Sequence, residues 1–313
     1  MSSLQLLMNP LTNPSFAPFM IRLLIVFVGA GLCLLVFQHR KAGVGSASSI
    51  LWQRFRSWCI IALLFTSAAF SGPLTLAMLC AYICWQGGRE YGRLTALPRS
   101  QVLYLILGGW LTLIATLLFG LTALMIAPVL AFFSWSVFML RPLTGEIESD
   151  RRFSANIAGL WGYLYLGWLP AYLVVLSTGK IPGLVLVVGV GVALSDVGAF
   201  CTGKLIKGPK LAPRLSPNKT WGGVPGNILG AGAALALTSF VLPGLVWWQY
   251  GLFALVIGLG CIWGDLLESL LKRQRGVKDA GELLPGFGGL LDRIDSLLLV
   301  APLTCFLTLR LFG

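Results

Sequence analysis

Long apolar segments recur along nearly the whole chain, separated by short polar ones. They are continuous rather than alternating, which favours helices over strands. About twenty apolar residues can cross a hydrocarbon core of about 30 Å, and in lipid only helices or closed barrels satisfy the backbone. The pattern therefore predicts an all-α, polytopic membrane helical bundle. The predicted spans are residues 20–38, 57–71, 73–87, 101–118, 121–140, 155–177, 182–203, 226–244, 249–271 and 295–311.

The distribution of charged residues supports this assignment of membrane spans. The second and third spans are short and meet at Gly72-Pro73, so we expect nine or ten transmembrane helices. With ten spans and an external N-terminus, 20 of the 23 Lys and Arg residues fall on one side of the membrane. Such an excess marks the cytosolic side. All 11 acidic residues fall on that half as well, which predicts a polar site at the cytosolic surface.

The composition excludes several classes of protein. Hydrophobic residues make up 57% of the chain and charged residues 11%, against roughly 25% charged in soluble domains. We interpret the net charge of +12 as membrane topology rather than nucleic-acid binding. The seven cysteines form no CxxC pair, so neither a zinc site nor a disulfide framework is indicated. The single histidine, His39, cannot build a Ser-His-Asp triad or an HExxH site alone.

We expect one integral membrane domain with two functional regions. Residues 1–190 are predicted to be scaffold helices. Residues 191–313 are predicted to be the catalytic region with its cytosolic loops, because seven of the 11 acidic residues follow residue 190.

The segment from residue 264 to 296 has the strongest chemical pattern. Asp265, Glu268, Ser269 and Lys272 occur at i, i+3, i+4 and i+7, which places them on one helical face. A carboxylate within a membrane span costs about 2.5–3.5 kcal/mol on insertion scales. A metal ion or a cation is therefore the expected partner. An interfacial ion pair between Glu268 and Lys272 is the alternative.

Two further acids, Asp292 and Asp295, begin the last span and share a face. One alternative is purely structural: the two acids would stabilise the beginning of the helix, as an N-cap and a first-turn acid. Together with Asp265, they could also ligate Mg²⁺, which takes one or two carboxylates plus phosphates and water. The polar loop before them carries Lys278, Asp279 and a glycine-rich turn, whose N–H groups can approach an anion.

A second group of polar residues follows the span that contains Asp196. The loop has Ser216 and Thr220 among its cations, an arrangement suited to phosphate capture. A plain positive-inside loop is the alternative. The cations are Lys204, Lys207, Lys210, Arg214 and Lys219.

Residues 264–296 resemble the signature of the phosphatidate cytidylyltransferase family. Residues 216–223 resemble the family's Ser-Pro-x-Lys-Thr loop, and residues 196–200 its Asp-x-x-Ala-Tyr run. The matching residues are dense over residues 195–300. Before residue 195 the resemblance rests on hydropathy and on Arg89-Glu90-Tyr91. Where the family pattern has His, this chain has Phe287, which cannot hydrogen-bond a phosphate as imidazole does. The matching signature positions are Ser269, Lys272, Arg273, Lys278, Asp279, Gly281, Pro285, Gly288, Gly289, Asp292, Arg293 and Asp295.

The resemblance implies that a phosphatidic acid oxygen attacks the α-phosphate of CTP, giving CDP-diacylglycerol and pyrophosphate. Catalysis would then be mostly positioning and charge neutralisation. It implies Asp265, Asp292 and Asp295 as Mg²⁺ ligands, with a second cation allowed. The expected catalytic residues are Asp265, Asp292, Asp295, Lys272 and Arg293. The expected substrate-binding residues are Ser216, Lys219, Thr220, Ser269, Arg273, Lys278, Asp279, Asp196, Gly288 and Gly289.

The expected partners are CTP, phosphatidic acid and membrane lipid, without nucleic acid; a homodimer is one assembly this allows. The expected location is the bacterial inner membrane, with the active site facing the cytoplasm.

Three alternative functions remain. Phe287 motivates a catalytically weak relative that binds lipid or acts as a scaffold. A CTP-dependent transferase for another lipid is the nearest enzyme. A transporter is disfavoured because the acids cluster at one face.

Overall fold

The computed structural model describes residues 6–40, 45–137, 146–242, 244–274, 276–277, 280–281, 283 and 288–312. Within them the fold is a helical bundle, as the hydropathy pattern predicts. The elements are η1 (Pro10–Thr12), α1 (Phe16–Arg40), α2 (Gly45–Phe70), α3 (Pro73–Thr95), α4 (Arg99–Phe119), α5 (Leu121–Ser136), α6 (Glu146–Tyr163), η3 (Leu164–Trp168), α7 (Ala171–Thr178), α8 (Leu184–Ile206), β1 (Lys210–Ala212), β2 (Ser216–Thr220), η4 (Trp221–Gly223), α9 (Val224–Leu237), η5 (Ser239–Val241), α10 (Trp247–Gln274) and α11 (Leu291–Phe312).

Six segments of the described chain are long and apolar enough to cross a membrane, so the protein is an integral membrane protein. Helices occupy all ten predicted spans, but the total of nine or ten crossings is not confirmed. Helices α5 and α9 have 16 and 14 residues, or about 24 and 21 Å, less than a hydrocarbon core of about 30 Å. The six segments are Phe16–Val36, Arg99–Phe119, Asp150–Thr178, Leu184–Ile206, Trp247–Gln274 and Leu291–Phe312.

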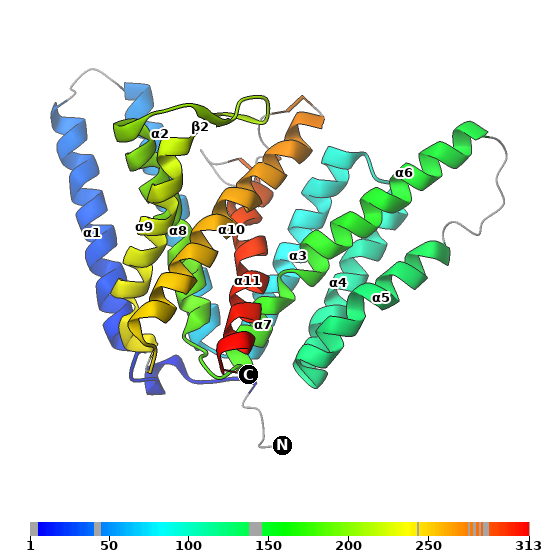
Figure 1. Ribbon diagram of the computed structural model, residues 1–313, viewed down its shortest axis with the longest axis horizontal. Helices are drawn as coiled ribbons and strands as arrows, with labels where there is room; N and C mark the ends of the chain where they lie inside the picture. Colours follow the sequence, from blue (N-terminus) through cyan, green and yellow to red (C-terminus); the bar gives the residue numbers. More distant parts are fainter. Residues whose placement is uncertain are drawn as a thin grey trace.

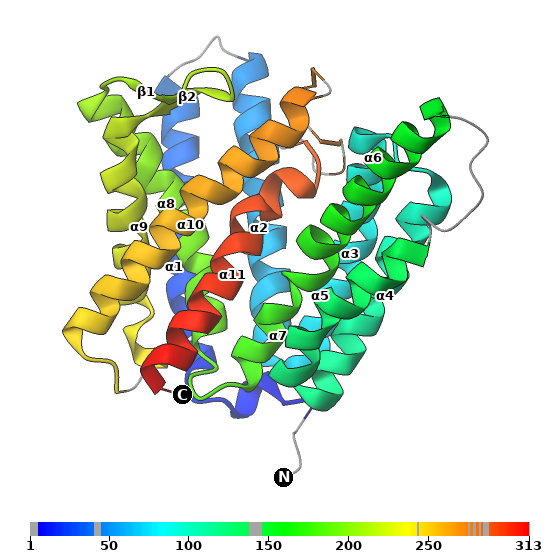
Figure 2. The same ribbon diagram turned by 45° about the vertical axis from the view of Figure 1, so that its right-hand side comes forward.

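The helices run roughly along one direction, which gives the molecule two ends (Figure 1). Both chain termini lie at the lower end of the view. The β1–β2 hairpin, the last turns of α10 and the beginning of α11 lie toward the upper end. In both views α10 and α11 are central, with α4, α5 and α6 on one side and α1, α8 and α9 on the other (Figure 2). The polar segments singled out above therefore approach one another at the upper end.

The one departure from an all-α fold in the described residues is a short antiparallel hairpin between α8 and α9. Lys210 pairs with Thr220 and Ala212 with Ser216, with an irregular register between the two pairs. The hydropathy pattern gave no signal for it, because these strands are short, polar and partly exposed. The hairpin holds the basic loop in a fixed conformation over the end of the bundle.

A close crossing of α10 and α11 depends on Gly264. A Cβ built there would lie 2.6 Å from the Ser296 Cα and 2.7 Å from the Asp295 backbone oxygen. No other residue type fits this approach without moving a helix, and small residues are common where membrane helices pack closely. Gly264 directly precedes Asp265, so the contact places the acidic faces of α10 and α11 side by side.

Both hydrophobic clusters join the two halves of the chain, and one of them reaches the beginning of α11. This one includes Leu166 of η3, Leu271 of α10, and Ile294 and Leu298 of α11, all buried. Side-chain atoms of Leu166 and Ile294 both lie within 4 Å of a Cβ built on Gly87 in α3. The elements that carry the C-terminal acids are thus packed against α3 and η3. Residue 190 lies inside α8, and a functional division there stays a prediction.

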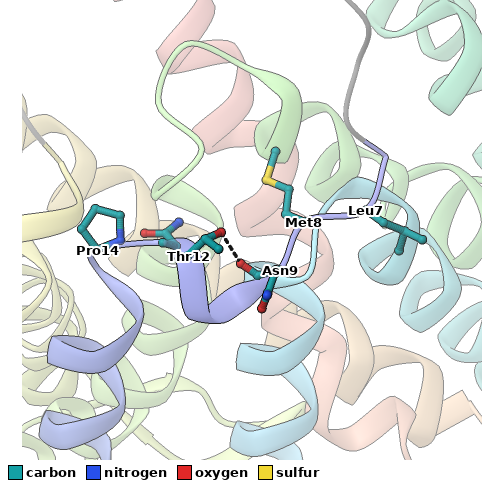
Figure 3. A pocket seen from close by; sticks show the side chains of 6 residues that line it. Leu7, Met8, Asn9, Thr12 and Pro14 are labelled. Carbon is teal, nitrogen blue, oxygen red and sulfur yellow. Dashed lines mark hydrogen bonds between the residues drawn. The ribbon is translucent and has the colours of Figure 1, made fainter.

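Figure 3 shows a pocket at the N-terminal segment, at the lower end of the molecule. Its lining residues include Asn9 and Thr12, whose hydroxyl donates to the Asn9 carbonyl at 2.8 Å. None of the six lining residues is ionisable. The pocket has no group for phosphate or metal chemistry, so the candidate site is the cluster of acids at the other end.

Candidate active site

Three carboxylates from two helices form the centre of the site. Asp265 and Glu268 of α10 and Asp295 of α11 each offer an oxygen atom within 4.8 Å of the other two. Glu268 is 1% exposed and Asp295 8%. The i, i+3 spacing puts the first two on one face of α10, and the contact at Gly264 brings α11 against that face. Three carboxylates this close repel one another when all are ionised, and a bound cation or proton relieves that repulsion.

Lys219 of β2 reaches the outer edge of this group. Its Nζ lies 2.5 Å from Asp265 Oδ2, with both side chains partly exposed. Ser269, one turn along α10, donates to Asp265 Oδ1 at 3.4 Å. The hairpin thus delivers a partly exposed cationic side chain to the most accessible of the three acids, where an anionic substrate could exchange with it.

Lys272 links Glu268, one of these three acids, to a fourth acid, Asp292. Its Nζ lies 2.5 Å from Glu268 Oε2 and 2.9 Å from Asp292 Oδ1. The alternative i, i+4 ion pair between Glu268 and Lys272 is therefore present. This ion pair engages only the Oε2 atom of Glu268. The other carboxylate oxygen, Oε1, is buried and has no hydrogen-bond partner among the described residues.

Asp292 has both oxygens engaged. Besides the Lys272 contact, its Oδ2 accepts hydrogen bonds from the backbone N–H groups of Ala280 at 2.9 Å and Gly289 at 2.8 Å. Asp292 is thus a first-turn acid of α11 and not its N-cap, and its hydrogen bonds fix the loop that leads into the helix. Asp292 is not one of the three mutually close carboxylates, although Lys272 links it to Glu268.

An acid from the other half of the chain holds the start of α11. Glu90 of α3 is 1% exposed and accepts from Leu290 N at 3.1 Å and Leu291 N at 2.9 Å. The Gln86 amide donates to the same carboxylate at 2.8 Å. A Cβ on Gly289 would lie 2.5 Å from Glu90 Oε2, so the chain needs glycine there. A carboxylate on the unpaired N–H groups of a helix N-terminus is favourable.

Two further predicted residues lie near the acidic group. Asp196 of α8 is accessible and is within electrostatic range of Asp265, Lys219 and Arg293. Arg293 of α11 is half-buried and also interacts electrostatically with Asp295. The structure therefore brings residues from α8, β2, α10 and α11 to one place.

The remaining predicted residues lie around this centre or outside the described chain. Arg273 is exposed and donates to the Leu215 carbonyl at 3.1 Å, which ties the hairpin to the end of α10. Ser216 and Thr220 lie in β2, and the Thr220 hydroxyl is buried without a hydrogen-bond partner among the described residues. Gly288 adopts a φ of 86°, which favours glycine. Lys278, Asp279, Pro285 and Phe287 lie outside the described residues.

The acidic group suits a hard divalent cation. Carboxylate oxygens from Asp265, Glu268 and Asp295 are the ligands that Mg²⁺ and Ca²⁺ prefer. The orphaned Glu268 Oε1 is a buried polar atom that such an ion would satisfy. The geometry adds Glu268 to the predicted ligands, and it adds Glu90, which the sequence marked only through a weak likeness of Arg89-Glu90-Tyr91.

The sequence matches the cytidylyltransferase family over residues 52–311. Three relatives are each named phosphatidate cytidylyltransferase. That of Mycobacterium leprae (strain TN) is 45% identical over 109 residues, 35% of this chain and 35% of the relative. That of Brucella suis biovar 1 (strain 1330) is 44% identical over 119 residues, 38% of this chain and 42% of the relative.

The phosphatidate cytidylyltransferase of Mycobacterium bovis (strain ATCC BAA-935 / AF2122/97) is 34% identical over 175 residues, 52% of this chain and 56% of the relative. Each of these matches thus spans less than two thirds of the relative's own length. The match to the family is broader, since residues 52–311 include all the helices from α3 to α10 and every described residue of the acidic site. On this extent of similarity, the chain belongs to the cytidylyltransferase family.

Proposed function

We propose that this protein transfers the cytidylyl group of CTP to phosphatidic acid, forming CDP-diacylglycerol and pyrophosphate. The observation that carries the proposal is the group formed by Asp265, Glu268 and Asp295, surrounded by Lys219, Lys272 and Arg293 at one end of a bundle of apolar helices. This charge pattern suits a reaction between two polyanions. Membership of the cytidylyltransferase family and relatives named phosphatidate cytidylyltransferase support the same substrates.

In this reaction an oxygen of the lipid phosphate forms a bond to the α-phosphorus of CTP, and the bond to the pyrophosphate oxygen breaks. The nucleophile is already an anion, so no histidine base is needed. This fits a chain whose single histidine, His39, lies at the end of the first predicted span. The protein's task is to hold the two anions in line and to offset their charge.

Asp265, Glu268 and Asp295 would hold the divalent cation, for which Mg²⁺ is the proposed identity. When bound, such an ion neutralises phosphate charge and orients phosphate oxygens. Asp292 was predicted as a direct ligand. Because both its oxygens are engaged, we propose instead that it positions Lys272 and the loop before α11.

The cations would bind the phosphates. Lys219 can exchange its contact with Asp265 for a phosphate of CTP, and Lys272 and Arg293 would bind the α-phosphate or the lipid phosphate. Arg273, Ser216, Ser269, Thr220 and the backbone N–H of Gly288 would contribute further donors, whereas the Gly289 N–H is already bound to Asp292. Lys278, Asp279 and Asp196 keep their predicted role as substrate contacts. A second cation and a homodimer stay predictions.

The membrane architecture fits a lipid substrate. Phosphatidic acid keeps its acyl chains in the bilayer and its phosphate at the surface, where α10 and α11 meet the hairpin (Figure 1). We propose that this end of the molecule faces the cytoplasm, since CTP is a cytoplasmic nucleotide and the Lys and Arg residues favour that side. The bacterial relatives suggest the inner membrane as the location.

The proposal is tested with purified protein in detergent micelles, phosphatidic acid, labelled CTP and Mg²⁺, with the lipid product identified by mass spectrometry. We expect CDP-diacylglycerol from the wild type and none from Asp265→Asn. Asp150→Asn, at an exposed acid of α6, is the matched control and should keep full activity.

Two results would contradict the proposal. Full activity of Asp265→Asn would remove this acid from the site. No product from the wild type with phosphatidic acids of several chain lengths, or with Mn²⁺ in place of Mg²⁺, would leave the lipid-binding or scaffold function. Product only with another lipid phosphate, such as a prenyl phosphate, would instead identify a different CTP-dependent transferase.

A further inference from the structure

Tyr165 is a polar group from the first half of the chain that the predicted site does not include. It lies in η3, the π-helical turn in the Asp150–Thr178 span, where the Leu169 N–H donates to the Leu164 carbonyl five residues earlier at 3.1 Å. Such turns are often found at functional sites. Its side chain is 2% exposed, and it belongs to the cluster that contains Ile294 and Leu298.

The Tyr165 hydroxyl is buried and has no hydrogen-bond partner among the described residues. The carboxylates of Asp295, Glu268 and Asp265 are within electrostatic range of this hydroxyl. Glu268 Oε1, which belongs to the same group of carboxylates, is likewise buried without a hydrogen-bond partner among the described residues. Two orphaned polar atoms beside one acidic group indicate that a ligand of that group satisfies both.

Two other buried tyrosines of the first half of the chain have hydrogen-bond partners for their hydroxyls. The Tyr91 hydroxyl donates to the Ala158 carbonyl at 2.8 Å. The Tyr163 hydroxyl lies 2.7 Å from Thr112 Oγ1, in the same helical span and two residues before Tyr165. Tyr165 thus differs from these two tyrosines: its hydroxyl has no acceptor among the described residues and is within electrostatic range of three acids.

We infer that the Tyr165 hydroxyl donates a hydrogen bond to an oxygen ligand, water or phosphate, of the divalent cation held by Asp265, Glu268 and Asp295. A neutral donor suits this place, because it orients a ligand without adding charge to the carboxylates. Tyr165 is then a positioning residue, which makes the first half of the chain part of the cation site. The inference rests on the cation site of the proposed function.

The test measures Mn²⁺ binding by calorimetry on the purified protein in detergent, without lipid, and with the α,β-methylene analogue of CTP absent or present. We expect Tyr165→Phe to weaken Mn²⁺ binding about tenfold, the size of one hydrogen bond to a charged group. The matched control is Tyr163→Phe, which removes the hydroxyl that contacts Thr112. It should lower the melting temperature and leave Mn²⁺ affinity within about twofold of the wild type.

The outcomes separate this inference from the proposed function. Wild-type affinity in Tyr165→Phe, combined with loss of Mn²⁺ binding in Asp295→Asn, would overturn the role of Tyr165 and keep the cation site. Equal weakening in both Tyr→Phe variants would mean that general loosening of the span explains the effect, which also overturns it. Absence of Mn²⁺ binding by the wild type under both conditions would overturn the inference together with the cation site.

Discussion

The two halves of this chain contribute to the site in different ways. Residues after 190 supply the accessible chemistry, as shown by Asp265 paired with Lys219 and by Asp196. Residues before 190 supply Glu90 and Tyr165, which are 1% and 2% exposed and contact the C-terminal elements from within the bundle. The first kind of group can meet a substrate directly, whereas the second acts from inside the bundle: Glu90 holds the start of α11, and Tyr165 is inferred to orient a ligand of the cation. A search for polar residues therefore finds the first kind more easily.

The same contrast divides the acids of α11. Asp295 belongs to the three mutually close carboxylates, whereas Asp292 is hydrogen-bonded to Lys272 and to two backbone N–H groups. Three residues of separation put both on one helical face, but the two meet different partners. Substitutions at these two acids should therefore separate loss of the cation site from loss of the contacts that position Lys272 and the loop before α11.

The largest effect is expected from the two acids of α11. Asp295→Asn and Asp292→Asn should each lower kcat/KM by about 10³-fold, or about 4 kcal/mol, because one weakens the cation site and the other releases Lys272 and the loop before α11. Calorimetry with Mn²⁺ separates them, since only Asp295→Asn should abolish binding. If Asp292→Asn abolishes Mn²⁺ binding and Asp295→Asn preserves it, Asp292 is the ligand, as the family resemblance implies.

A smaller effect is expected where α10 and α11 cross. Gly264→Ala places a Cβ 2.6 Å from the Ser296 Cα, which should separate the two acidic faces and lower activity by about 10- to 100-fold. Gly251→Ala is the matched control in the same helix, because a Cβ there meets no atom within 4 Å. The control should be as active as the wild type and no less stable, since alanine favours helix. Equal activity of the two variants would show that the close crossing does not position the acids.

The sequence predicted the parts of the fold that depend on hydropathy and spacing. Helices occupy every predicted span, and the i, i+3 spacing of Asp265 and Glu268 placed both on the face that meets α11. Family membership is confirmed by the match over residues 52–311. The count of spans was less predictable, because a helix as short as the 14-residue α9 gives an apolar signal without the length of a full crossing.

Other features could not be predicted because they depend on contacts between distant segments. Nothing local to Glu90 says that it accepts hydrogen bonds from N–H groups 200 residues later. Tyr165 is one of seven tyrosines, and only the π-helical turn and the packing of η3 against α11 place it beside the acids. The proposal of Glu268 in place of Asp292 as a ligand likewise required the distances among the carboxylates and the hydrogen bonds of Asp292.

The smallest effect is expected from Glu90→Gln, which tests positioning from the first half of the chain. The amide keeps the size of the side chain, but its NH₂ group must face either the Leu290 or the Leu291 N–H, so one hydrogen bond to a charged acceptor is lost. We expect a loss of about 1.5–3 kcal/mol of stability and an activity about tenfold lower, with the KM for CTP nearly unchanged. Thermal unfolding and steady-state kinetics measure both.

Asp150→Asn is the control for removing one negative charge from the first half of the chain, because that acid is exposed and should change neither quantity. Glu90→Ala should lower stability further than Glu90→Gln, since it also leaves a cavity beside Gly281 and Gly289. An unchanged melting temperature in Glu90→Gln would mean that α11 begins correctly without this carboxylate. A raised KM for CTP with normal kcat would instead make Glu90 a substrate contact, and the division between accessible chemistry and buried positioning would no longer follow the two halves of the chain.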